Sequence, residues 1–124
     1  MSVEVPPPAR LARSPLRGVP RRTAGDHLRA ALQALSGGHA RIASHRETSW
    51  ASVTFAGTRH RLELLFEGAA AVEAGELLLA ELPEHEFDIP RQLVADATVR
   101  EVDHRMLPEP CLAASIELLL LEDA

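Results

Sequence analysis

The hydrophobic residues that follow residue 23 recur first at helical spacing. They are Leu28, Ala31, Leu32 and Leu35. Thr23 and Asp26 have the spacing of a capping box, which begins a helix. Ser36-Gly37-Gly38 would end it, because glycine reaches the left-handed conformation without steric cost. The pattern therefore predicts a helix over residues 24–36.

Polar and apolar residues then alternate with the period of two that a half-buried strand requires. We predict strands over residues 39–47, 49–56 and 59–67. Gly57-Thr58 is a Gly-X pair that suits a type II′ turn, so it should join the second of these strands to the third. On the face turned to the core, this register pairs Phe55 with His60, Val53 with Leu62 and Ala51 with Leu64.

A second helix and two further strands complete the pattern. Residues 69–82 are rich in alanine, leucine and glutamate, which favour helix, and Pro83 would end that helix. Strands are predicted over residues 92–104 and 111–121. The Pro-Glu-Pro loop at 108–110 separates them, because proline cannot donate to a ladder.

The order of these elements is α-β-β-β-α-β-β. It predicts an α+β two-layer sandwich, in which two helices cover one face of an antiparallel sheet of about five strands. In element order and acidity the chain resembles the small acidic chaperones of type III secretion, which are dimers, although no sequence motif is shared. The resemblance implies a dimeric protein that binds other proteins.

Charge divides the chain at about residue 22. Residues 1–22 contain five arginines, one acid and five prolines, whereas residues 23–124 contain eight arginines and seventeen acids. A basic, proline-rich segment without periodicity cannot bury enough apolar surface to fold. We therefore predict a disordered tail over 1–22 and a single α+β domain over 23–124, a size usual for one domain.

Composition also indicates the cellular setting. All thirteen basic residues are arginine, and lysine, asparagine and tyrosine are absent, which is typical of a GC-rich bacterial genome. Cys111 is the only cysteine, so no disulfide forms within the chain. No apolar run reaches the length of a membrane span, and no apolar region follows the basic start as in a secretory signal. We expect a cytoplasmic bacterial protein.

One face of the predicted sheet lacks a cover. If the helices lie over Leu62, then Trp50, Leu65, Leu119 and Leu121 point the other way. A small monomer seldom leaves a contiguous apolar patch in water, so these four residues are the predicted interface of a homodimer or of a complex with another protein or peptide. Nucleic acid is not the expected partner, because the body is acidic and only 3% of residues are aromatic.

The loop over residues 84–90 is the candidate metal site. His85, Glu86 and Asp88 lie within it, and His104 is a possible partner from the following strand. Imidazole and carboxylate groups together suit a divalent cation. The alternative is that these residues form a solvated loop between a helix and a strand, without any metal or other cofactor.

Single residues give weaker signals for catalysis. His60 should face the core, where an imidazole beside a carboxylate could work as an acid or a base, but a packing role is commoner. His39 and His45 are expected to be exposed on an edge strand, and His27 to lie in the first turn of a helix. Cys111 lies at a strand start, where a packing role is again the usual one.

No nucleotide-binding, metalloprotease or hydrolase motif is present in the sequence. We therefore expect binding and not catalysis, with function exerted through a homodimer or a protein or peptide partner. The alternative function is that of a protein or enzyme that binds a metal or small molecule near the 84–90 loop.

Overall fold

The structure is a computed structural model that describes residues 22–122. The predicted basic tail, apart from Arg22, lies outside the described residues. In chain order the elements are α1 (Ala24–Leu35), β1 (Arg41–Ala51), β2 (Ala56–Glu67), α2 (Ala69–Glu81), the short 3-10 helix η1 (Leu82–Glu84), β3 (Gln92–Arg105) and β4 (Cys111–Glu122).

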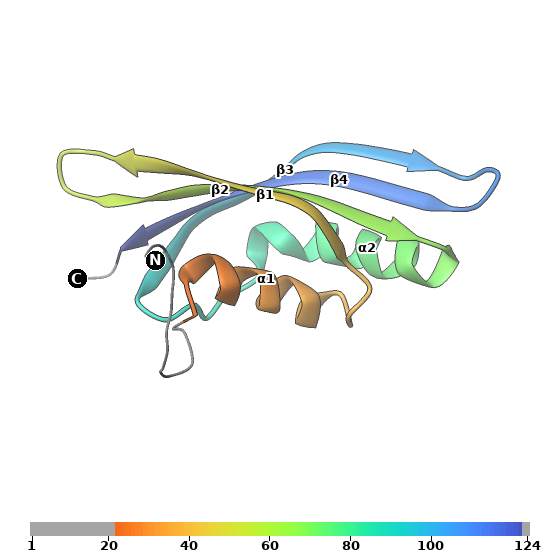
Figure 1. Cartoon of the computed structure of the whole chain (residues 1–124), viewed down its shortest axis with the longest axis horizontal. Coiled ribbons are helices and arrows are strands. Elements are labelled where there is room, and N and C mark those ends of the chain that lie inside the picture. Colours follow the sequence, from red (N-terminus) through yellow and green to blue (C-terminus); the bar gives the residue numbers. More distant parts are fainter. Residues whose placement is uncertain (1–21, 123–124) are drawn as a thin grey trace, which may run out of the picture.

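The strands form one antiparallel sheet in the order β1-β2-β4-β3. Both helices lie on the same face of this sheet, so the molecule has two layers (Figure 1). The predicted α+β class and the single helical face are confirmed. Beyond the helices, the β1–β2 and β3–β4 hairpins project at opposite ends of the molecule (Figure 1).

The described sheet has four strands, so the prediction of about five was wrong. The two strands expected over 39–47 and 49–56 are one strand, β1. Thr48 and Ser49, where we expected a break, pair with Arg59 and Thr58 in β2. The alternation is interrupted instead near Ala43, where the register with β2 shifts by one residue.

The position of the β1–β2 turn also differs from the prediction. Ala51 pairs with Ala56, and the chain reverses over residues 52–55. The Ser52 hydroxyl accepts a hydrogen bond from the Phe55 N–H (3.1 Å), and the Ser52 N–H donates to the Phe55 carbonyl (2.8 Å). These bonds close the turn without glycine. Val53 and Phe55, which we expected in the core, are exposed at the hairpin tip.

Gly57 therefore has a different role from that of a turn residue. It lies inside β2 opposite Leu121, and a Cβ at this position would come within 2.2 Å of the Leu120 carbonyl oxygen. Only glycine allows the backbones of β2 and β4 to approach so closely here.

Both predicted helices are confirmed. Thr23 caps α1 as expected: its hydroxyl accepts from the Asp26 N–H (3.1 Å), and the Asp26 carboxylate accepts from the Thr23 N–H (2.9 Å). Gly37 and Gly38 follow the helix with φ values of 62° and 84°. Helix α2 ends just before Pro83, which lies in η1.

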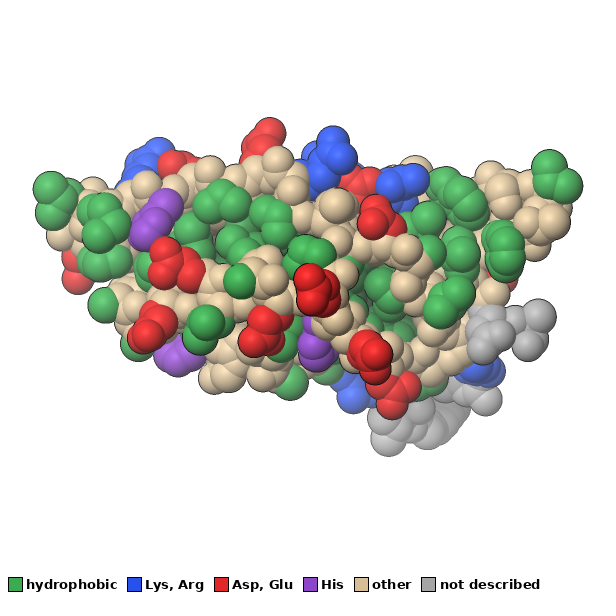
Figure 2. All heavy atoms as spheres, turned by 180° about the vertical axis from the view of Figure 1, so that it is seen from behind, with side chains coloured by type: hydrophobic (Ala, Val, Ile, Leu, Met, Phe, Trp, Pro, Cys, Tyr) green, Lys and Arg blue, Asp and Glu red, His purple; other side chains and the backbone are tan. Residues whose placement is uncertain are grey.

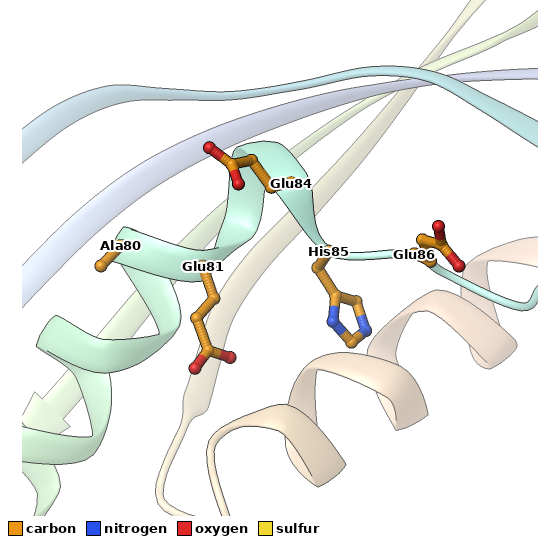
Figure 3. Close-up of a pocket in the computed structure, with 5 residues that line it drawn as sticks. All are labelled: Ala80, Glu81, Glu84, His85 and Glu86. Atoms are coloured by element: carbon orange, nitrogen blue, oxygen red, sulfur yellow. The ribbon is translucent and has the colours of Figure 1, made fainter.

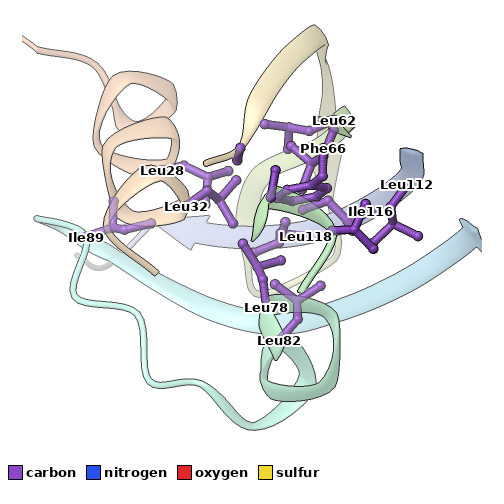
Figure 4. Close-up of a cluster of buried hydrophobic side chains, with 14 of the residues drawn as sticks. Leu28, Leu32, Leu62, Phe66, Leu78, Leu82, Ile89, Leu112, Ile116 and Leu118 are labelled. Atoms are coloured by element: carbon purple, nitrogen blue, oxygen red, sulfur yellow. The ribbon is translucent and has the colours of Figure 1, made fainter. Parts of the chain in front are cut away.

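The core fills the space between the helices and the sheet (Figure 4). Its largest side chains are Leu28, Leu32, Leu62, Leu64, Phe66, Leu78, Leu82, Leu112, Ile116, Leu118 and Leu120, each at most 1% exposed. The predicted strand over 111–121 indeed turns Leu112, Ala114, Ile116, Leu118 and Leu120 to one buried face. No helix among residues 22–122 is long and apolar enough to cross a membrane.

Candidate functional site

The sheet face that carries no helix is a candidate binding surface, and we call it the outer face. Side chains alternate along β2, so Arg59, Arg61, Glu63 and Leu65 point outward while the residues between them are buried. The register across the sheet groups the outward residues in rows. From the β1–β2 turn onward, and in the strand order β1-β2-β4-β3, four of these rows are Trp50–Gly57–Leu121–Leu93, Thr48–Arg59–Leu119–Asp96, Arg46–Arg61–Glu117–Thr98 and Ser44–Glu63–Ser115–Glu101.

The four residues predicted from sequence as an interface lie on the outer face. Trp50 and Leu121 share its first row with Leu93, which is 58% exposed. Leu119 lies in the next row, whereas Leu65 lies near the other end of β2. Trp50, Leu65 and Leu119 are partly buried in the single chain, and Leu121 is 8% exposed. The face therefore has apolar residues at two separated places, not in one continuous stripe.

Charged residues fill the region between those places, with three arginines grouped toward the β1–β2 turn and three carboxylates grouped toward the β3–β4 turn. Asp96 shares the row of Arg59, and Arg105 lies 3.3 Å from Asp103. Arg46, Arg59 and Arg61 line a hollow of about 240 Å³ together with Glu117. Glu63, Glu101 and Asp103 line a neighbouring hollow of about 120 Å³, toward the β3–β4 turn. We call these two halves the basic half and the acidic half of the outer face.

Glu117 is the centre of the basic half. Its carboxylate accepts hydrogen bonds from Arg59 (2.7 Å) and Arg61 (3.3 Å), and Arg100 lies 3.7 Å away. These bonds hold the pKa of Glu117 below its usual range. Three guanidinium groups therefore surround one carboxylate, and the basic half retains positive charge.

The loop predicted to bind a metal lines a shallow hollow on the helical side. His85 and Glu86 border it with Glu81 and Glu84 (Figure 3). In Figure 3 the carboxylates of Glu84 and Glu86 point away from the His85 ring. That ring packs edge-on against Phe87, with centroids 4.5 Å apart.

The other two predicted metal ligands lie apart from this hollow. Asp88 is exposed beyond Glu86, and His104 lies near the far end of β3, where its Nδ1 is 3.7 Å from a carboxylate oxygen of Glu76 in α2. Among residues 22–122, the structure does not bring His85, Glu86, Asp88 and His104 together as one ligand set. Cys111 is half-buried at the start of β4, opposite Arg105.

A cluster of histidine and carboxylate side chains lies instead between α1 and the sheet. Glu47 of β1 pairs directly with His60 of β2, and His45 lies two residues before Glu47 on the same face. Each of the three offers a ligand atom, and these atoms all lie within 4.8 Å of one another. His60 is 1% exposed, His45 is partly buried, and Glu47 is exposed.

Hydrogen bonds connect the two rings to α1. An Nη1 atom of Arg29 lies 2.5 Å from His45 Nδ1, and His45 Nε2 lies 2.9 Å from His60 Nδ1. Because arginine only donates, His45 Nδ1 must accept, and its Nε2–H must donate to His60. The remaining donor, His60 Nε2–H, is buried and has no partner among the described residues.

Burial controls the charge of both rings. It lowers the pKa of His60, an effect that the nearby Glu47 only partly opposes. Burial also lowers the pKa of His45, and the Arg29 guanidinium lowers it further. Both effects favour the neutral form of each ring, in which one ring nitrogen accepts a hydrogen bond: His45 Nδ1 from Arg29 and His60 Nδ1 from His45.

The sequence analysis found only one member of this cluster. It placed His60 in the core, which is confirmed, but it expected His45 to be exposed and Phe55 to be the neighbour of His60. The Phe55 pairing followed from the wrong turn position, whereas His45 was expected to be exposed because it was assigned to an edge strand. The usable signal was the spacing His45-x-Glu47 on a strand, which puts both side chains on one face.

No protein-family model matches the chain, and no curated protein matches it. Among solved structures, the chain is similar to one described as "Virion of native gene transfer agent (GTA) particle". The TM-score is 0.50 at 14% sequence identity, and the match covers 82% of this chain and 92% of the other. At this identity the similarity shows a shared fold.

Proposed function

We propose that the protein acts by binding protein through its outer face, and that a second copy of the same chain occupies this face. The observation that carries the proposal is the grouping of charge into a basic half and an acidic half. A two-fold axis lying across the strands would place the basic half of each copy on the acidic half of the other. Arg61 would then face the partner's Glu63, twice in one symmetric interface.

The apolar residues at the ends of the outer face support the same arrangement. Trp50, Leu93 and Leu121 lie in one row at the end nearest the β1–β2 turn. Charged side chains stand along the top of the molecule in Figure 2, and apolar side chains lie at both of its ends and across its middle. A partly exposed apolar row that lies beside complementary charges is typical of a protein–protein interface.

The hairpin tips offer contacts to further partners. Val53 and Phe55 at one end, and Met106 and Leu107 at the other, are all more than half exposed. The structural neighbour belongs to a virion particle by its description, which supports a role in a protein assembly for this chain also. The lone cysteine and the arginine-only basic composition support a bacterial cytoplasmic setting.

Light scattering over a range of protein and salt concentrations tests the proposal. We expect twice the chain mass of 13.5 kDa at micromolar concentration, and dissociation as salt is raised, because exposed charges are screened within about 8 Å at physiological ionic strength. Trp50 fluorescence should shift to longer wavelength as the dimer dissociates. A 13.5 kDa mass at every concentration, with unchanged Trp50 emission, would overturn the proposal.

A further inference from the structure

We propose that His45, Glu47 and His60 bind a divalent first-row transition ion, such as Zn²⁺, between α1 and the sheet. Two imidazoles and one carboxylate are a ligand set that suits zinc and non-haem iron, and they leave coordination positions open for water or another ligand. The proposal is independent of the proposed dimer, because the cluster lies on the helical face of the sheet and not on the outer face.

The spacing of the three side chains fits one ion. Zinc–nitrogen bonds measure about 2.0–2.1 Å, so two nitrogens on one tetrahedral ion lie about 3.3 Å apart. His45 Nε2 and His60 Nδ1 are 2.9 Å apart, and the ligand atoms of all three residues lie within 4.8 Å. Side-chain rotations would bring these atoms around a common centre without a change in strand register.

The backbone holds the ligands in place. Glu47 and His60 are direct cross-strand partners near the middle of the β1–β2 pair, and His45 follows the same pleat. Their separation is therefore set by strand register and not by a mobile loop, which favours a preorganised site. Glu47 is exposed, so an ion can reach the cluster without unfolding of the chain.

Gly25 leaves room for the carboxylate. It lies in the first turn of α1, and a Cβ at this position would come within 2.8 Å of a Glu47 carboxylate oxygen and 3.2 Å of His45 Cε1. The first turn of α1 therefore has a residue without a side chain where it passes over the cluster. Glycine is the only residue that keeps this volume open.

Arg29 competes with the ion for the His45 ring. While it donates to His45 Nδ1, the ring proton is on Nε2, the atom that must lose its proton to bind a metal. Binding therefore requires Arg29 to leave His45 and the ring proton to move from Nε2 to Nδ1. Arg29 also bonds Asp26, which can hold the guanidinium after it leaves the ring.

Titration calorimetry with ZnCl₂, on the full chain without a histidine tag, tests the site. Co²⁺ absorption in the visible range is the second readout, because it reports direct nitrogen and oxygen ligation. We expect one ion per chain, and removal of a ligand by His45→Gln or Glu47→Gln should weaken binding at least about tenfold. Arg29→Ala should strengthen binding. His39→Gln, an exposed histidine beyond the cluster, is the matched control and should leave affinity unchanged.

Glu47→Gln keeps the test decisive, because this side chain is exposed and its exchange should not unfold the protein. Absence of Zn²⁺ heat and of Co²⁺ absorption in both the natural chain and Arg29→Ala would overturn the proposal. Equal affinity in the natural chain and Glu47→Gln would also contradict it. Neither result bears on the dimer, which light scattering measures separately.

Discussion

Glu47 and His60 face each other directly across the β1–β2 pair, on the side of the sheet where α1 lies. This relationship follows from the reversal of the chain at residues 52–55. A turn at Gly57-Thr58 would have put Phe55 opposite His60 and carried Glu47 away from it. The hairpin register therefore decides whether the histidine cluster exists.

Gly25→Ala tests how closely α1 controls this cluster. The added Cβ would meet the Glu47 carboxylate, which is mobile enough to move aside. We therefore expect little change in melting temperature but about 10–100-fold weaker Zn²⁺ binding by calorimetry. Ala30→Gly, on the exposed side of the same helix, should lower stability by about 1 kcal/mol and leave binding unchanged. Unchanged binding in Gly25→Ala would contradict the role given to Gly25.

Gly75→Ala tests the packing of α2 on the sheet. A Cβ at residue 75 would come within 2.7 Å of the Phe66 ring and 2.9 Å of Leu112. Alanine is the better helix former by about 1 kcal/mol, but overpacking a core costs about 1–3 kcal/mol. We expect a net loss of stability in urea unfolding. A more stable variant would show that α2 can shift away from Phe66.

Gly57→Ala should destabilise the sheet more than Gly75→Ala does. Its Cβ would meet backbone atoms of Leu120, which cannot rotate away as a side chain can. We expect loss of the β2–β4 pairing near the β1–β2 hairpin, visible as faster amide hydrogen exchange there. Exchange rates equal to those of the natural chain would contradict the close approach of these strands.

The sequence patterns predicted the helices and the last two strands well because their signals are local. A capping box, glycine stops and proline boundaries act within a few residues. The β1–β2 turn was misplaced because Gly57 resembles a turn residue. Glycine is needed at this position for another reason: the Leu120 backbone, on a strand distant in sequence, leaves no room for a Cβ. The histidine cluster was missed for the same reason, since it depends on register across β1 and β2 and on the approach of α1.

Glu117 provides a pH-dependent contribution to stability. Hydrogen bonds from Arg59 and Arg61 lower its pKa in the folded chain. A carboxyl group with a lowered pKa stabilises the fold above its unfolded value of about 4.3, and this contribution is lost as the pH falls through the folded value. The melting temperature of Glu117→Gln should therefore lie below that of the natural chain at pH 7, and the gap should shrink toward pH 3. A difference in melting temperature that stays constant with pH would contradict the ion pairs of Glu117 with Arg59 and Arg61.

In the proposed dimer, two copies pack outer face to outer face, with Arg61 of each on Glu63 of the other. The direct test is the light-scattering mass of Arg61→Glu, of Glu63→Arg and of their equimolar mixture, after circular dichroism has shown that both variants fold. Each variant alone places like charges in contact and should have a mass of 13.5 kDa, whereas the mixture restores opposite charges at both contacts and should have twice that mass. A monomeric mixture, or variants that dimerise alone as strongly as the natural chain, would contradict the account.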